Sequence, residues 1–134
     1  MPPLKTYIVE DSPVIRENLI ATLEELGPVQ VVGHADAEAG AVQWLTRAEN
    51  EAELVIVDIF LRSGSGLGVL RASRDFARRR RLVVLSNYTT DAVRRQCLAL
   101  GATRVFDKSN DIDALLAYCD ELAANGSARG IVRA

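Results

Sequence analysis

The residues of this chain best suited to chemistry are acidic side chains that follow strand-like segments. Asp58 comes directly after Leu54–Val57, a run of apolar residues that are mostly β-branched. Such a run is typical of a strand buried on both faces, as in a parallel sheet. This kind of strand delivers the residue after it to the carboxyl edge of the sheet, where open α/β folds bind their ligands. An isolated carboxylate is costly to bury, so Asp58 needs partners.

Other strand-like segments are also followed by polar residues that could serve as partners. These are Tyr7–Val9 with Glu10 and Asp11, Leu82–Leu85 with Ser86, and Val105–Phe106 with Asp107 and Lys108. Carboxylates, a hydroxyl and a lysine therefore follow four separate strands. The combination indicates a polar site built from several strand ends.

Length and composition indicate a single globular domain. The chain has 134 residues, of which 49% are hydrophobic and 25% charged, with a net charge of −2. This charge gives no general attraction to nucleic acid or to an anionic membrane. We see no signal peptide and no apolar run of membrane-spanning length, so we expect a cytoplasmic protein. In that reducing compartment Cys97 and Cys119 are expected to be small buried residues without a disulfide.

Strand-like segments alternate with helical patterns along the whole chain. We expect strands at Lys5–Val9, Val29–Gly33, Leu54–Val57, Leu82–Leu85 and Thr103–Phe106. We expect helices from Pro13, after Asp36, over Leu67–Phe76, from Asp91 to Leu100 and from Ile112 to Leu122. This alternation predicts a parallel sheet covered on both faces, with right-handed crossovers. We expect one domain over residues 1–124 and a short polar tail over residues 125–134.

Several residues mark the expected helix ends. Ser12 is suited to cap the first helix, with Pro13 at its first position. Gly27 is expected to end that helix in a left-handed conformation. Asp36 is expected to cap the second helix, and Ser109 or Asn110 the last one.

Two further features have alternative interpretations. Trp44 lies beside the apolar stripe of the second helix, and we interpret it as a packing residue at the helix edge. The run Arg78–Arg81 could be a phosphate or nucleic-acid patch. Because no aromatic residues are interspersed, we favour a solvated helix end whose cations complement the helix dipole.

Taken together, these motifs resemble those of response regulator receiver domains, over residues 5–123. The resemblance depends on Glu10-Asp11, Asp58, Gly66, Ser86, Gly101-Ala102 and Lys108. Each is weak evidence alone, but their order at successive strand ends is specific. The resemblance implies a flavodoxin-like α/β fold, with five parallel strands in the order 2-1-3-4-5 and five helices on both faces.

The resemblance also implies a phosphoacceptor and a metal site. Asp58 would accept a phosphoryl group, and an aspartate is a feasible nucleophile for this reaction. Asp11 and Asp58 would be direct ligands of Mg²⁺, a hard cation that prefers oxygen ligands. Glu10 would act through water, and Phe60 would add its backbone carbonyl.

The remaining site residues would bind the phosphoryl group. Lys108 would neutralise its oxygens, Ser86 would donate a hydrogen bond to one of them, and Asn87 lies beside Ser86. A simpler role for Lys108 is an ion pair with Asp58 or Glu10. Both roles are compatible, because an unphosphorylated receiver is expected to keep such a pair.

One departure from the family pattern concerns the aromatic residue that usually couples phosphorylation to the signalling face. It stands three residues before the lysine, where this chain has Val105. Phe106 comes one residue later, and neighbouring strand residues point to opposite faces. Phe106 therefore cannot replace the missing aromatic residue.

Three other positions also differ from the pattern. Ser109 follows the lysine where proline is usual, and a cis peptide without proline costs about 2.5–4 kcal/mol, so the conformation of this peptide is left open. Arg62 replaces a usual proline in the loop after Asp58, and Asn87 is bulkier than the usual small residue.

Phe60 and Tyr88 occupy the two positions that flank the phosphorylation pocket in this family. They stand two residues after Asp58 and two after Ser86. We expect these aromatic side chains to restrict the attacking water and to give a long-lived phosphoryl state.

These observations favour a stand-alone phosphorylation switch that catalyses only its own phosphorylation and dephosphorylation. A sensor histidine kinase or phosphotransfer protein would be the donor. The output would be altered binding to a protein partner, or to a second copy through the last strand and the last two helices. Candidate surface contacts are Arg94, Arg95, Arg104, Asp111 and Asp113. We expect no direct contact with nucleic acid or membrane.

The sequence is also compatible with three alternatives. The chain could be the receiver part of a larger regulator, for example a DNA-binding one, or a degenerate receiver that acts by binding alone. An enzyme or cofactor binder on a similar fold is the third. A haloacid-dehalogenase-type phosphatase needs an aspartate where Phe60 stands, and a flavodoxin needs a phosphate loop where Glu10 and Asp11 would repel phosphate. A dinucleotide-binding fold needs a glycine-rich turn there.

Overall fold

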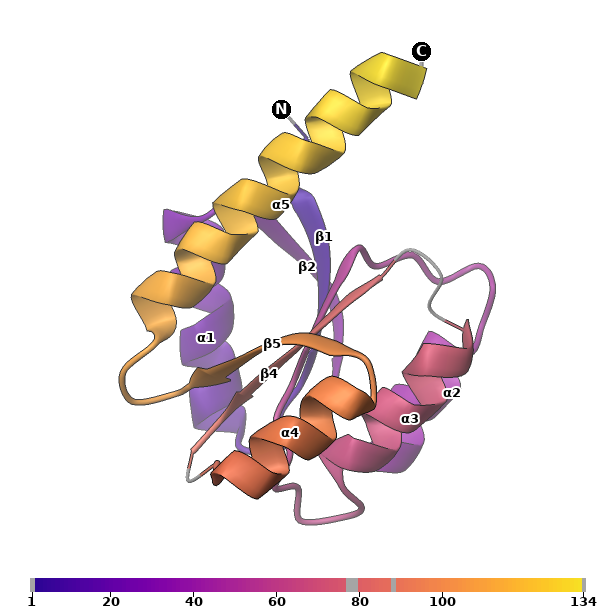
Figure 1. Cartoon of the computed structure of the whole chain (residues 1–134), viewed down its shortest axis with the longest axis vertical. Coiled ribbons are helices and arrows are strands. Elements are labelled where there is room, and N and C mark those ends of the chain that lie inside the picture. The colour runs from indigo at the N-terminus through magenta and orange to yellow at the C-terminus, as the bar shows by residue number, and fades with distance from the viewer. Residues whose placement is uncertain (1, 77–79, 88, 134) are drawn as a thin grey trace.

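A computed structural model describes residues 2–76, 80–87 and 89–133. Its centre is a parallel sheet in the order β2-β1-β3-β4-β5 (Figure 1). The strands are β1 (Leu4–Val9), β2 (Val29–Ala35), β3 (Leu54–Val57), β4 (Arg81–Ser86) and β5 (Ala102–Asp107). The predicted strand order is confirmed.

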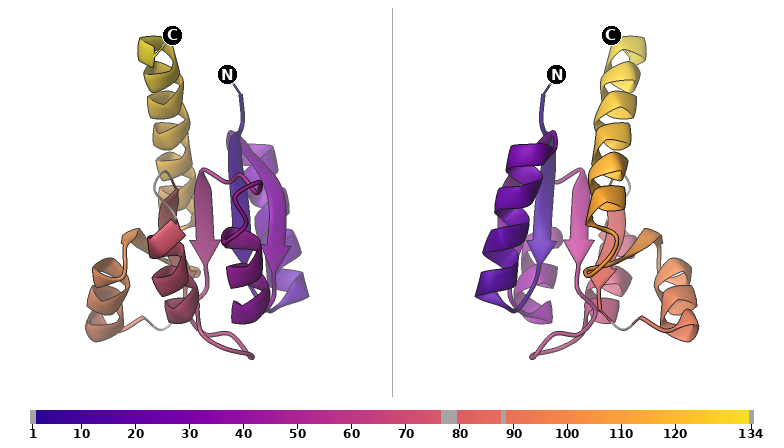
Figure 2. Two further views of the ribbon diagram at one scale, coloured as in Figure 1. Left: turned by 90° about the vertical axis from the view of Figure 1, so that its right-hand side faces the viewer. Right: turned by 90° about the vertical axis from the view of Figure 1, so that its left-hand side faces the viewer.

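Five helices connect the strands and cover both faces of the sheet. They are α1 (Pro13–Leu26), α2 (Glu38–Leu45), α3 (Gly66–Phe76), α4 (Asp91–Ala99) and α5 (Ile112–Arg133). Figure 2 shows α2 and α3 in front of the sheet from one side, and α1 and α5 in front of it from the other. The buried side chains of α4 belong to the same core as those of α2 and α3.

Alternation along β3 creates two separate hydrophobic cores. Val55 and Val57 pack on the side of α2, α3 and α4, whereas Leu54 and Ile56 pack on the side of α1 and α5. Successive strand residues point to opposite faces, so both sets must be apolar when both faces are covered. The continuous apolar run before Asp58 is thus explained by its central place in the sheet.

The same alternation separates Val105 from Phe106 on β5. Val105 packs in the core between the sheet and α4, and Phe106 packs in the core between the sheet and α5. There the Phe106 ring lies 6.0 Å from the ring of Tyr118. The prediction that Val105 and Phe106 point to opposite faces of the sheet is confirmed.

The start of α1 agrees with the sequence, but its end does not. The Ser12 hydroxyl accepts a hydrogen bond from the backbone N–H of Ile15 (3.3 Å), and Pro13 is the first helical residue. Gly27 has φ −128° and ψ 169°, so the predicted left-handed cap is wrong. The chain is already extended at Gly27 because β2 begins two residues later, at Val29.

Two other predicted caps are also wrong. Helix α2 is preceded by Ala37, whose side chain makes no capping bond, and Asp36 lies before it. The start of α2 lies one residue later than a cap at Asp36 would place it, because β2 continues to Ala35, beyond its predicted end. Helix α5 starts directly after Asp111, whose carboxylate accepts from the backbone N–H of Asp107 (2.9 Å), so neither Ser109 nor Asn110 is its cap.

The segment after residue 124, predicted as a polar tail, continues helix α5 to Arg133. Figure 1 shows this helix projecting beyond the sheet. All four prolines lie at or before position 28, so none interrupts the last helix. Among the described residues, no helix is long and apolar enough to span a membrane.

Trp44 and Arg80 pack at the end of α2. The Trp44 ring stacks on Tyr7 with 4.1 Å between centroids, which supports its interpretation as a packing residue. Arg80 donates to the carbonyls of Leu45 (2.7 Å) and Asn50 (2.9 Å), so it complements the C-terminal end of α2. It is half-buried and therefore not part of a solvated helix end. Arg78 and Arg79 lie outside the described residues.

The two cysteines should be unreactive in the folded protein. Cys97 and Cys119 are both free and fully buried. Burial raises the pKa of the Cys97 thiol and, with a smaller contribution from Asp120, raises that of Cys119 to about 12. Because the thiolate is the reactive form, we expect no labelling by a thiol reagent at pH 8 until denaturant unfolds the chain. Fast labelling of the native protein would contradict this packing.

Candidate functional site

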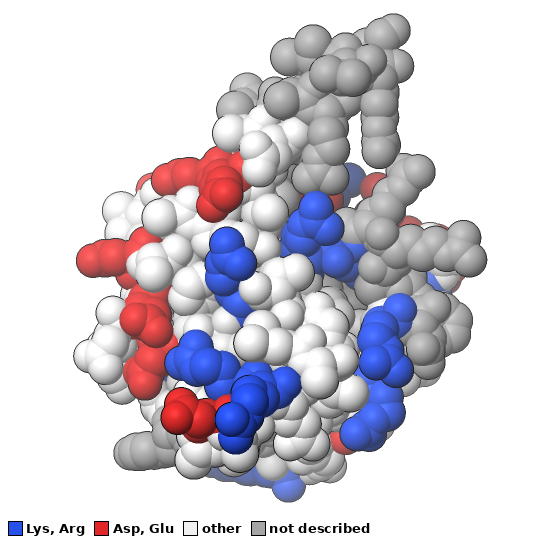
Figure 3. Space-filling model, viewed as in Figure 1, with Lys and Arg blue, Asp and Glu red and all other residues white. Residues whose placement is uncertain are grey.

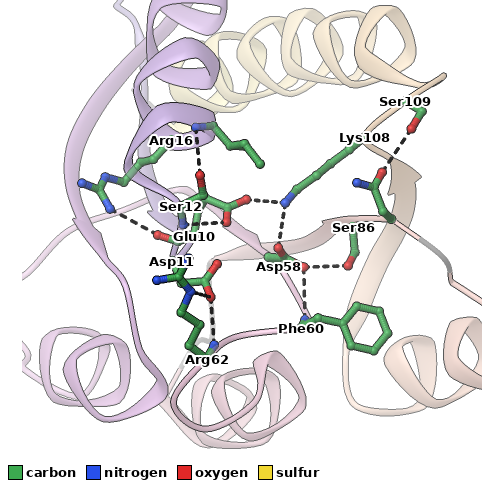
Figure 4. Close-up of polar contacts among 12 residues, drawn as sticks. Glu10, Asp11, Ser12, Arg16, Asp58, Phe60, Arg62, Ser86, Lys108 and Ser109 are labelled. Carbon is green, nitrogen blue, oxygen red and sulfur yellow. Dashed lines mark hydrogen bonds and ion pairs between the residues drawn. The ribbon is translucent and has the colours of Figure 1, made fainter.

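The polar residues predicted to meet do lie together at the carboxyl edge of the sheet. Glu10 and Asp11 follow β1, Asp58 follows β3, Ser86 ends β4 and Lys108 follows β5. Figure 4 shows their side chains converging on one region. Parallel strands end at the same edge, so residues far apart in the sequence become neighbours.

Lys108 connects two of the carboxylates. Its ammonium nitrogen lies 2.7 Å from Asp58 Oδ2 and also pairs with Glu10 Oε1 (Figure 4). The exposed fractions are 13% for the Lys108 side chain, 3% for Glu10 and 8% for Asp58. These three side chains therefore form a buried ion cluster. Solvent screens the attraction between their charges far less than it screens the attraction within a surface ion pair.

The pKa values of this cluster reflect burial and pairing together. Burial alone would lower the pKa of Lys108, but the hydrogen bonds and charges of Asp58 and Glu10 outweigh it and raise the pKa. Burial raises the pKa of Glu10, against the hydrogen bonds from Lys108 and Ser12. Lys108 is therefore firmly positive at neutral pH and can serve as a permanent counter-ion.

The second oxygen of Asp58 is held by two hydrogen-bond donors. The Ser86 hydroxyl donates to Oδ1 at 2.6 Å, and the backbone N–H of Phe60 donates to the same oxygen at 3.1 Å. With Lys108 on Oδ2, both oxygens have fixed partners. The orientation of this carboxylate is thus set by groups from β4, from the loop after β3 and from the residue after β5.

Gly66 allows the loop after Asp58 to close tightly. A Cβ atom at this position would lie 2.2 Å from the carbonyl oxygen of Asp58. The backbone N–H of Gly66 also donates to the carbonyl of Ile59 (3.0 Å). A side chain here would push the loop away from the site, which gives a physical reason for glycine at the start of α3.

Asp11 is held by a residue whose contact the sequence did not reveal. The backbone N–H of Arg62 donates to Asp11 Oδ2 at 2.8 Å, and the Arg62 Nε atom lies 3.8 Å from the same oxygen. Proline, the usual residue at this position in the family, has no N–H to donate. That substitution was the only signal in the sequence that could have indicated this bond.

The acidic group is suited to a divalent cation. Glu10, Asp11 and Asp58 can each offer one oxygen such that the three atoms lie within 4.8 Å of one another. Oxygen donors of this kind match the preference of Mg²⁺. The backbone carbonyl of Phe60 as a further ligand remains a prediction.

Asn87 and Ser109 join the two loops beside the site. The Ser109 hydroxyl donates to Asn87 Oδ1 at 3.2 Å, and the backbone N–H of Lys108 donates to the carbonyl of Ser86 at 3.2 Å. The peptide between Lys108 and Ser109 is trans, although proline is usual after the lysine in the family. These bonds fix the end of β5 against the end of β4.

The predicted switch and pocket-flanking residues lie around this centre. Val105 is buried, and its carbonyl accepts a hydrogen bond from Arg94 Nη1 of α4 (3.0 Å). Phe60 is 54% exposed. Tyr88 lies outside the described residues.

The comparisons with known proteins agree with this fold and site. The model of the response regulator receiver domain family matches residues 6–120, so the chain belongs to this family. Receiver domains are the signalling switches of two-component systems, and phosphorylation and Mg²⁺ are typical of them. The family resemblance and the flavodoxin-like fold predicted from the sequence are thereby confirmed.

Three similar proteins illustrate the relationship. The response regulator UvrY of Escherichia coli (strain K12) is 26% identical over 108 residues, which is 78% of this chain and 47% of UvrY. The response regulator domain of Thermotoga maritima CheB has a TM-score of 0.79 at 21% identity, over 89% of this chain and 95% of that domain. A Burkholderia pseudomallei response regulator with a phosphorylated aspartic acid, calcium ion and citrate has a TM-score of 0.75 at 25% identity, over 94% and 74% of the two chains. The chain thus spans about half the length of the curated relative UvrY.

Loss of Lys108 should destabilise the fold when no metal is present. Lys108→Met leaves Glu10 and Asp58 buried beside each other, and breaking a buried pair in this way costs about 3 kcal/mol. We expect this loss of unfolding free energy in urea titrations with a chelator present. Adding Glu10→Gln to Lys108→Met should restore part of it, because one carboxylate charge is removed. An unchanged stability of Lys108→Met would show that the cluster does not depend on its cation.

Proposed function

We propose that Asp58 accepts a phosphoryl group from a sensor histidine kinase or phosphotransfer protein, in a Mg²⁺-dependent reaction. The observation that supports this best is the environment of Asp58. The carboxylate lies between the Lys108 ammonium (2.7 Å) and the Ser86 hydroxyl (2.6 Å), beside two further carboxylates. A nucleophile, a fixed cation and a hydroxyl donor are the groups that phosphoryl transfer to a carboxylate requires.

In the proposed reaction an oxygen of Asp58 attacks the phosphorus atom of the donor's phosphohistidine. The new bond joins this oxygen to phosphorus, while the bond from phosphorus to the histidine nitrogen breaks and the nitrogen keeps the electron pair. Lys108 neutralises charge on the phosphoryl oxygens, and Ser86 donates to one of them. Mg²⁺ bound by Asp11 and Asp58, with Glu10 through water and the Phe60 carbonyl, would neutralise further charge on the same oxygens.

Phosphorylation would also change the contacts that hold the strand ends. In the unphosphorylated protein, Lys108 and Ser86 are both bonded to the Asp58 oxygens. When one of these oxygens carries the phosphoryl group as a mixed anhydride, these donors turn to the new phosphoryl oxygens. Because Ser86 ends β4 and Lys108 follows β5, the change is transmitted to the loops that lead into α4 and α5.

We propose that the output is altered protein binding through the surface of α4, β5 and α5. The candidate contacts are Arg94, Arg95, Arg104, Asp111 and Asp113. Figure 3 shows lysine and arginine side chains gathered on the face formed by α4 and β5. This surface could also join two copies of the chain. We include no direct contact with nucleic acid or membrane in this proposal.

A second candidate is the receiver part of a larger regulator. The observation that favours it is that the match to UvrY covers only 47% of that relative. A degenerate receiver that acts by binding alone would instead lack transfer to Asp58. The site geometry argues against this, because the cation and the hydroxyl donor that the proposed transfer requires, Lys108 and Ser86, both lie within hydrogen-bonding distance of Asp58.

The proposed transfer can be tested by intact mass after incubation with acetyl phosphate. We expect the wild-type chain to gain one phosphoryl group with Mg²⁺ present and none with a chelator. Asp58→Asn should gain none in either condition, because its amide is not a nucleophile for this reaction. If neither acetyl phosphate nor a cognate phosphodonor protein modified the wild type, the proposed transfer would be refuted.

The flanking aromatic residues should control how long the phosphoryl group persists. Phe60 follows Asp58 by two residues, and its backbone N–H is bonded to the acceptor carboxylate. We expect the double variant Phe60→Asn, Tyr88→Ala to lose its phosphoryl group faster than wild type, because water then has easier access. The decay of the phosphorylated mass with time measures this, and equal rates would count against the shielding role.

A further inference from the structure

The three carboxylates of the site are balanced by two cationic side chains. Lys108 serves Glu10 and Asp58, whereas Asp11 is contacted by Arg62 (Figure 4). Both Arg62 contacts, the backbone N–H at 2.8 Å and Nε at 3.8 Å, reach the same oxygen of Asp11. Each acidic group therefore has a positive partner among the side chains of the protein itself.

We propose that Arg62 competes with Mg²⁺ for Asp11 and thereby lowers the affinity of this chain for the metal. The inference rests on the proposed function, in which Asp11 is a metal ligand. A hydrogen-bond donor and a cation on a carboxylate both reduce the negative potential that a divalent ion experiences. Arg62 would thus set the Mg²⁺ concentration at which the switch can be phosphorylated.

The two Arg62 contacts should differ in strength. The N–H belongs to the main chain, at normal hydrogen-bond distance from a carboxylate whose side chain is only 16% exposed. The guanidinium is 86% exposed, so solvent and salt screen its charge. The larger part of the competition should therefore come from the backbone bond and the smaller part from the charge.

Arg62 can be changed without removing any group proposed to bind the phosphoryl oxygens. Its described polar contacts go to Asp11, while those of the Asp58 carboxylate go to Lys108, Ser86 and Phe60. Metal affinity and phosphoryl chemistry can therefore be measured separately. Lys108 does not offer this separation, because it contacts the proposed phosphoacceptor itself.

The test is calorimetric titration of each purified chain with MgCl₂, without any phosphodonor. Arg62→Ala keeps the backbone N–H and removes the charge. We expect it to bind Mg²⁺ about twofold more tightly at low ionic strength, with the gain lost at high salt. Arg62→Pro removes both contacts, and we expect about tenfold tighter binding that persists at high salt.

Arg47→Ala is the matched control, because it removes the same charge from an exposed position just after the C-terminal end of α2. It should bind Mg²⁺ with wild-type affinity. Thermal unfolding in chelator verifies that each variant is folded. If Arg62→Pro fails to fold, the salt-dependent gain of Arg62→Ala still tests the proposal.

The outcomes separate this inference from the proposed function. Wild-type binding that Asp11→Asn abolishes, with unchanged affinity in both Arg62 variants, would overturn the inference alone. Weaker binding in Arg62→Pro would also overturn it, since Arg62 would then orient Asp11 for the metal. If neither the wild type nor any variant bound Mg²⁺, both the inference and the proposed metal site would fail.

Discussion

The arrangement of the site depends on one requirement, which is that buried carboxylates need a positive partner. Glu10 and Asp58 are nearly inaccessible to solvent, and leaving two such charges unpaired would cost several kcal/mol. The Lys108 ammonium bridges them from the opposite side of the site. This pairing requires the ends of β1, β3 and β5 to meet, so the functional residues and the sheet order depend on each other. The ion cluster is both a structural element and the proposed reaction centre.

The same cluster gives the proposed switch two alternative states. Without phosphate, Lys108 and Ser86 are bound to Asp58, and the loops after β4 and β5 are joined by the bond between Ser109 and Asn87. A phosphoryl group would provide new acceptors for the same donors. The aromatic residue that usually transmits this change is replaced by Val105. In this chain Arg94 of α4 donates a hydrogen bond to the Val105 carbonyl, and the Val105 side chain shares a core with Cys97 of the same helix.

The sequence predicted the fold and the composition of the site better than it predicted local contacts. The places of Asp58, Ser86 and Lys108 could be predicted because each residue follows a distinctive apolar run, whereas the strand order followed from the family resemblance. The caps at Gly27 and Asp36 were wrong because β2 starts directly after one helix and runs further than its apolar residues indicate. The bond from Arg62 to Asp11 joins a loop N–H to a side chain 51 residues away, so the only sign of it in the sequence was an N–H at position 62 where proline is usual.

The central claim is that Asp58, and no neighbouring carboxylate, carries the phosphoryl group. Borohydride reduces an aspartyl phosphate to homoserine, and peptide mass spectrometry then locates the altered residue. After treatment with acetyl phosphate and Mg²⁺, we predict homoserine at position 58 and unmodified Glu10 and Asp11. Reduction at either of those residues, or none at position 58 in a protein that has gained a phosphoryl group, would contradict the account.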